Sequence, residues 1–80
     1  DLSAEDRTAM VRSMVASLSN RLATEGGSAD EWARLITAYG VLGETTAASE
    51  VWLEAKEVFA TSNAAMDILR TAATGAGVGP

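Results

Sequence analysis

Two segments of this chain carry bulky and small apolar residues at the intervals that two antiparallel helices need in order to share one seam. In the first segment, Trp32, Leu35 and Tyr39 recur at helical spacing, with Ile36 beside Leu35. The second segment supplies a large residue flanked by two small ones, namely Ala48, Trp52 and Ala55. Residues three and four positions apart share one face of a helix, so both segments predict amphipathic helices that pack against each other.

Start and stop signals divide the chain into about four helices. Ser28 and Glu31 have the spacing of a capping box, and the preceding Gly26 and Gly27 interrupt the helical pattern. Gly43 suits the left-handed cap of a helix that stops near Leu42. The other helices are expected from Ser3 to about Thr24, from Thr45 or Thr46 onward, and after the cap candidates Thr61, Ser62 and Asn63.

Each of these helices has an apolar face that predicts the core. On the first helix this face comprises Met10, Val11, Met14, Val15, Leu18 and Leu22. On the third it comprises Ala48, Val51, Trp52, Ala55, Val58 and Phe59, and on the fourth Met66, Ile68, Leu69 and Ala72. Short connections between amphipathic helices predict antiparallel hairpins. We therefore expect an all-α domain over residues 1–74, followed by a flexible tail at residues 75–80 that buries no face.

Composition excludes several classes of function. The net charge of −5 and the scattered basic residues argue against nucleic-acid binding, which needs clustered Lys and Arg. The absence of His and Cys removes the usual catalytic and metal-ligating groups, and neither a phosphate-binding glycine loop nor a G-x-S-x-G turn is present. We expect no enzyme activity, no metal and no cofactor. No apolar run reaches the roughly 20 residues of a membrane span.

The two apolar segments resemble the tetratricopeptide pattern, W-x2-L-G-x2-Y followed by A-x3-F. Ile36 stands where that pattern has glycine, and Ala60 stands at the place of its terminal proline. With the repeat taken as residues 29–62, the chain contains one complete unit and a half-unit on each side. The resemblance implies helix pairs that stack into a scaffold with a peptide-binding concave face.

A second resemblance rests on MVRSMVASL at residues 10–18 and EWARLITAYGVLGE at residues 31–44. Over residues 8–60 the chain resembles the periplasmic domain of the CcmI family of c-type cytochrome maturation factors. That resemblance implies a chaperone-like domain that holds a helical segment of apocytochrome c and works with other maturation proteins to deliver it to haem ligation. It also implies a periplasmic location and an inner-membrane anchor upstream of this chain.

The concave face of such a repeat comes mostly from the first helix of each pair. The predicted partner-binding residues are therefore Asp30, Ala33, Arg34, Thr37 and Val41, continued by Asp67 and Thr71. Arg34 could grip a carboxylate of a partner in two places. Alternatively, Arg34 pairs with Asp30 one turn earlier as an ordinary surface ion pair.

Other candidate residues also have structural explanations. Trp32 and Trp52 could stack on a ligand, but signature positions favour core packing. Met10, Met14 and Met66 could line an adaptable apolar groove, although such spacing more often indicates core. Without His, haem ligation by Met lacks its usual axial partner. The alternative to partner binding is a helical oligomerisation module whose half-units complete one another between chains.

Overall fold

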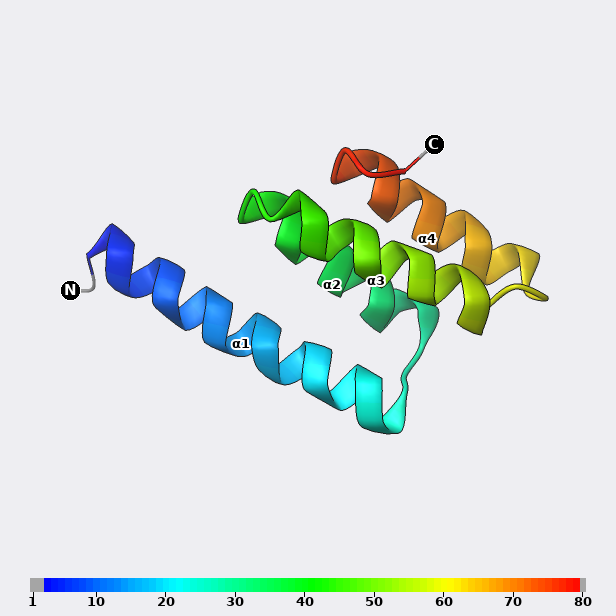
Figure 1. Ribbon diagram of the computed structural model, residues 1–80, viewed down its shortest axis with the longest axis horizontal. Coiled ribbons are helices and arrows are strands. Elements are labelled where there is room, and N and C mark those ends of the chain that lie inside the picture. Colours follow the sequence, from blue (N-terminus) through cyan, green and yellow to red (C-terminus); the bar gives the residue numbers. More distant parts are fainter. Residues whose placement is uncertain (1–2, 80) are drawn as a thin grey trace.

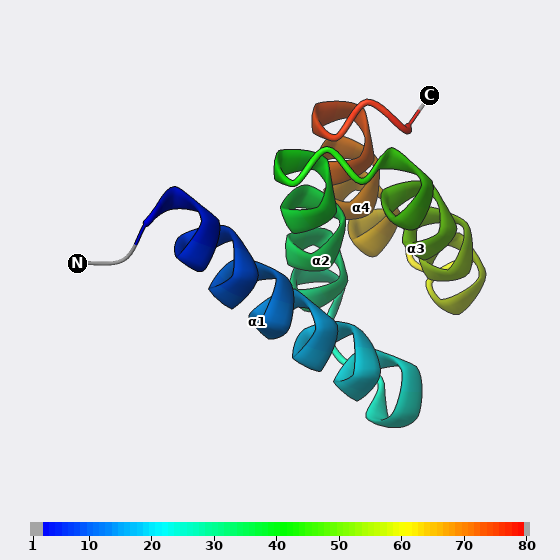
Figure 2. The ribbon, with the colours of Figure 1, turned by 60° about the vertical axis from the view of Figure 1, so that its left-hand side comes forward.

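The computed structural model describes residues 3–79 and shows four helices, which confirms the predicted all-α class. The helices are α1 (Ala4–Glu25), α2 (Ala29–Val41), α3 (Thr45–Val58) and α4 (Asn63–Gly75), and no strand occurs in residues 3–79. Helices α2, α3 and α4 lie side by side, with α3 antiparallel to both of its neighbours (Figure 1). Helix α1 crosses α2 at an angle, and its N-terminal half projects away from the other helices (Figure 2).

Local capping signals set the helix boundaries as the sequence predicts. The Ser28 hydroxyl accepts a hydrogen bond from the Glu31 backbone N–H at 3.3 Å, and the Ser28 N–H donates to Glu31 Oε1 at 3.4 Å, which completes the capping box. Ser3 and Ser62 cap α1 and α4 through their side chains. Gly43 has φ +74° and its N–H donates to the Gly40 carbonyl, so it ends α2 in the left-handed conformation expected from the sequence.

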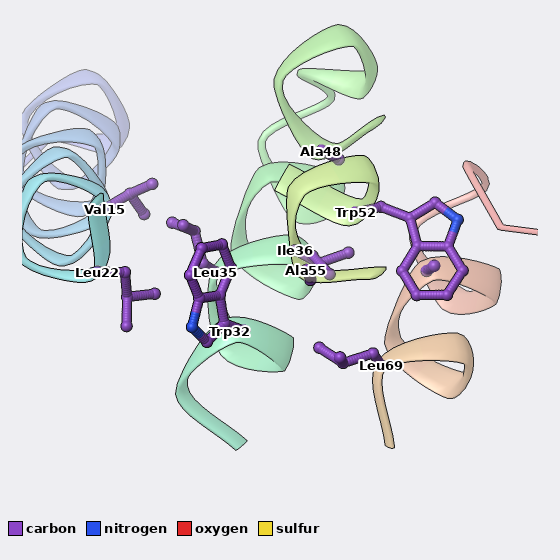
Figure 3. Packing of buried hydrophobic residues seen from close by; sticks show 10 residues of the cluster. Val15, Leu22, Trp32, Leu35, Ile36, Ala48, Trp52, Ala55 and Leu69 are labelled. Carbon is purple, nitrogen blue, oxygen red and sulfur yellow. The ribbon is translucent and has the colours of Figure 1, made fainter. Parts of the chain in front are cut away.

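The core lies mainly between α2, α3 and α4. Its least exposed members include Leu35 and Ile36 from α2, Ala48 and Ala55 from α3, and Leu69 from α4. Both tryptophans are 3% exposed, as a core role predicts. Their indoles occupy different parts of the core: Trp32 lies on the side of α2 that faces α1, and Trp52 points toward α4 (Figure 3). The Trp32 ring packs edge-on against Phe59, with 6.4 Å between the ring centroids.

Only part of the apolar face predicted for α1 is buried. Val15 and Leu22 are in the core, but Met10, Val11 and Met14 are 52%, 40% and 67% exposed. The prediction of core positions for these three residues is wrong because α1 outreaches its neighbour. At 1.5 Å per residue, the 22 residues of α1 span about 33 Å and the 13 residues of α2 about 20 Å.

Two further core predictions are wrong for a related reason. Val58 is 56% exposed and Ile68 is 39% exposed, because each lies at the flank of its helix beside the stripe that packs. On α4 the packed stripe runs through Ala65, Leu69 and Ala73, one residue removed from the register that includes Ile68.

The sequence predicts a flexible tail at residues 75–80 that buries no face, but Gly75 ends α4 and the next four residues bond to that helix. Gly77 has φ +79° and donates to the Thr74 carbonyl, while the Val78 N–H donates to the Ala73 carbonyl. These two bonds make a Schellman motif, in which the residue after the glycine makes an apolar contact with the helix. Val78 accordingly packs on the core and is half-buried. Pro80 lies outside the described residues.

Helix α2 lies close to the C-terminal cap of α4 at a glycine. A Cβ built on Gly40 would lie 2.7 Å from the Ala76 Cβ and 2.9 Å from the Ala76 Cα. Ile36, at the position where the repeat pattern has glycine, is instead fully buried. The close contact thus lies one helical turn after the position that the pattern suggests.

Candidate partner-binding surface

The predicted binding residues of α2 form an exposed stripe on the side away from the core. Asp30, Arg34, Thr37 and Val41 are all exposed, and Ala33 is half-buried beside them. Four of these five line one shallow, open depression, together with Ala38; Val41 does not. Val41 is 81% exposed near the end of the helix. The stripe is therefore exposed as predicted, but the depression along it is shallow and open.

The two predicted residues of α4 lie in a second, separate depression. It is lined by Asp67, Arg70, Thr71 and Thr74. The Asp67 carboxylate forms an ion pair with Arg70, with 3.0 Å between Oδ1 and Nη1. The Thr71 hydroxyl donates a hydrogen bond to the Asp67 backbone carbonyl at 2.9 Å. The polar groups of Asp67 and Thr71 thus already have partners within their own helix. The structure brings the predicted residues into two shallow depressions and not into one groove.

Arg34 does not form the surface ion pair that the sequence offered as its structural role. No carboxylate of the described residues lies within ion-pair distance of its guanidinium, Asp30 included. Its charge acts instead at longer range on Glu31, where it contributes to a lowered pKa. Arg34 and Asp30 are therefore predicted binding residues whose charges face solvent without an ion pair to any described residue.

A different surface stands out on α1. Met10, Val11 and Met14 are neighbours at the three- and four-residue spacing of one helix face, and each is well exposed. We call these three side chains the methionine face. The sequence contained this signal, since a Met-lined groove was one of its two interpretations. The burial of these residues depended on which part of α1 lies against α2.

Helix α1 is held in place from its middle to its C-terminal end. Val15 and Leu22 are buried, and Figure 3 shows them directed toward Leu35 and Trp32 of α2. An ion pair of 2.6 Å joins Arg12 to Glu44 in the turn between α2 and α3. Among the described residues, 3–11 make no comparable contact, so the first turns of α1 and the methionine face remain accessible.

A second ion pair fixes the other end of α1. Arg21 donates to Glu31, the capping residue of α2, and this bond together with the Ser28 backbone N–H lowers the pKa of the Glu31 carboxyl below its ordinary value. Both ion pairs that bind α1 to the rest of the chain are exposed to solvent. They orient α1 and add little stability of their own.

Two kinds of feature were not found in residues 3–79, a metal-ligating cluster and a membrane-spanning helix. That part of the chain has no group of three or more Asp, Glu, His or Cys side chains arranged to hold a metal ion. None of its helices has the length and apolar character needed to cross a bilayer. The rings of Trp32 and Trp52 are buried, which keeps both from stacking on a ligand at the surface.

Comparisons with protein-family models, with curated proteins and with solved structures find no match for this chain. The resemblances to the tetratricopeptide pattern and to the CcmI family therefore stay predictions from the sequence.

Proposed function

We propose that this chain is a non-catalytic protein-interaction domain that binds an amphipathic helix of a partner protein on the methionine face of α1. The observation that carries the proposal is the exposure of Met10, Val11 and Met14 on a helix half that no other part of the described chain covers. Neighbouring large apolar side chains at helical spacing are the usual docking element for the apolar face of another helix.

The chemistry of methionine favours this use. Its unbranched, polarisable side chain adapts to different apolar partners, which is why methionine is common on surfaces that bind helices. The chain carries a net charge of −5, so a partner helix with basic residues on its polar face is attracted at long range. Arg7, one turn before Met10, makes no ion pair with any described residue and offers one site for a partner carboxylate.

The identity of the partner is the finer part of the proposal, and the sequence resemblance alone supports it. On that basis the partner is a helical segment of apocytochrome c, held for delivery to haem ligation with other maturation proteins. The domain would then work in the periplasm as part of an inner-membrane-anchored protein. The domain itself binds no haem and no metal in this proposal.

Calorimetric titration with a synthetic amphipathic helix from a c-type apocytochrome tests both parts. We expect Met14→Glu to weaken binding at least tenfold, because the charge would be desolvated in an apolar contact. Val41→Glu is the matched control, since it places the same charge on an equally exposed apolar residue of α2. Arg34→Ala tests the stripe predicted from the sequence.

The pattern of losses assigns the surface. Binding that survives Met14→Glu and is lost in Val41→Glu or Arg34→Ala would place the site on α2 and refute the assignment to α1. If the cytochrome peptide does not bind but an unrelated basic amphipathic helix does, the face is correct and the partner is wrong. If neither peptide binds, the domain is not a helix-binding module of this kind.

Self-association through the methionine face is the second candidate, favoured by the fact that two copies could cover the same apolar residues symmetrically. The like net charge of two copies opposes it. Light scattering after size exclusion distinguishes the two functions. A dimer that Met14→Glu converts to a monomer would support self-association, and a monomer at all concentrations would exclude it.

A further inference from the structure

Helix α1 is attached to the rest of the fold through a single neighbour. Within residues 3–79 it packs on α2 alone, whereas α2, α3 and α4 each pack on one another. Its buried contribution consists of Val15 and Leu22, with Leu18 half-buried between them. A helix of 22 residues is thus held by the apolar side chains of only its second half.

Helices α2 to α4 hold most of the core without α1. The five core residues with 0% exposure all come from these three helices: Ile36, Ala48, Ala55, Leu69 and Ala73. The ends of α2 are also fixed by groups within the same three-helix unit, namely the capping box at Ser28 and the glycine cap at Gly43. Loss of the α1 contact uncovers part of α2 but leaves these five residues and both caps in place.

The contact under α1 contains an unsatisfied polar group. The Trp32 indole N–H is buried and has no hydrogen-bond partner among the described residues. Figure 3 shows this indole between α2 and α1, next to Leu22. Burying an N–H without an acceptor opposes the docking of α1, because the group gives up its hydrogen bond to water and gains none. Release of α1 returns the group to solvent.

The connection between α1 and α2 permits such a release. It consists of Gly26, Gly27 and Ser28, and Gly26 adopts φ +75° with no atom within 4 Å of a Cβ built on it. Rotation at Gly26 therefore meets little steric resistance. A short pivot beside a small, partly unfavourable contact is the arrangement expected of an element that opens locally.

We infer that α1 detaches from α2 as a unit, pivoting at Gly26 and Gly27, while α2, α3 and α4 stay folded. The open form uncovers Trp32 and Leu35 on α2. It also joins Val15, Leu18 and Leu22 to the methionine face, so that the apolar stripe of α1 extends along most of the helix. This inference concerns the free chain and does not depend on the proposed partner.

Native-state hydrogen exchange by NMR at increasing urea concentration tests the inference. We expect the indole N–H of Trp32, which detachment of α1 returns to solvent, to show an opening constant at least tenfold larger than that of the Ile36 and Leu69 amides. The indole should also respond less steeply to urea, since local opening exposes less surface than global unfolding. One opening constant and one urea slope for all three groups would refute the inference.

Met66→Ala provides an independent check, because Met66 is a half-buried residue of α4 that lies away from α1. The substitution should increase exchange of the Ile36 and Leu69 amides several-fold and leave the Trp32 indole unchanged. Equal acceleration of the indole and these two amides would mean that α1 opens only when the whole domain unfolds. The variant alters a partly exposed side chain, so the fold should persist.

Discussion

The contact between Gly40 and Ala76 is a close approach of α2 to the C-terminal cap of α4, and it makes Gly40→Ala an informative perturbation. The added Cβ would lie 2.7 Å from the Ala76 Cβ, which is 0.7 Å short of the 3.4 Å at which ordinary contact begins. The opposing atoms are a methyl group and backbone, which cannot rotate away. Helix α4 or its cap must therefore shift relative to α2.

Two opposing effects set the size of the change. Overpacking of this kind costs about 1–3 kcal/mol, whereas alanine is a better helix former than glycine by about 0.8–1 kcal/mol. Gly40 lies inside α2 and does not have a positive φ, so replacing it by alanine gains the full difference in helix propensity. The net expectation is a loss of about 1 kcal/mol in the free energy of unfolding, which lowers Tm by about 4–8 °C in a domain of this size.

Urea unfolding followed by circular dichroism measures this difference, and the chain provides its own control. Gly75 is also helical, but a Cβ built on it meets no atom within 4 Å. Gly75→Ala should therefore leave stability unchanged or raise it by about 0.5 kcal/mol. The double variant Gly40→Ala with Ala76→Gly removes the opposing methyl group and should recover part of the loss, because the backbone Cα of residue 76, 2.9 Å from the added Cβ, remains.

The reasoning fails if Gly40→Ala is as stable as the wild-type chain. It also fails if Ala76→Gly does not rescue the variant, because the loss would then have a cause other than the contact between these two residues.

Three further predictions concern single residues. Leu22→Ala should lower the free energy of unfolding by about 2–3 kcal/mol, because it leaves a cavity in the apolar contact between α1 and α2. Leu53→Ala alters an exposed side chain and should change the same quantity by less than about 0.5 kcal/mol in the same urea assay. Gly43→Ala should cost about 1 kcal/mol in thermal unfolding although the added Cβ meets no atom, since its φ of +74° disfavours a side chain; an unchanged Tm would contradict this account of the cap. Because the pKa of Glu31 is lowered, the contribution of its carboxylate to folding stability is fully present above pH 4.5, its ordinary pKa, and is lost as the pH falls through the folded pKa. The difference in the free energy of unfolding between wild type and Glu31→Gln should therefore shrink on acidification in a pH series of urea titrations.

Features set by a few adjacent residues were predictable from the sequence. The capping box of Ser28 and Glu31 and the left-handed Gly43 depend on groups within four residues of each other, so their outcome needs no knowledge of the tertiary fold. The cap at Gly77 could have been found by the same logic, since Val78 after the glycine is the expected apolar partner. It was missed because the glycine-rich composition suggested a structureless segment.

Features that depend on relative helix length were not predictable. The periodicity of α1 places Met10 and Met14 on the same stripe as Leu22, and nothing in the local sequence states that α2 is too short to cover them. The α2 stripe containing Arg34 was correctly expected to be exposed. Whether that stripe forms a groove depends on how far the neighbouring side chains project from the surface. In this fold the depression along the stripe is shallow.

The two ion pairs of α1, Arg12 with Glu44 and Arg21 with Glu31, have a consequence for the behaviour of the chain in different buffers. Both are open to solvent, and no other ion pair between helices occurs in residues 3–79. Dissolved salt screens exposed charges but leaves buried apolar contacts unaffected or slightly strengthened. Ionic strength therefore acts selectively on the position of α1, and raising it loosens this helix while the remaining three helices hold together as before.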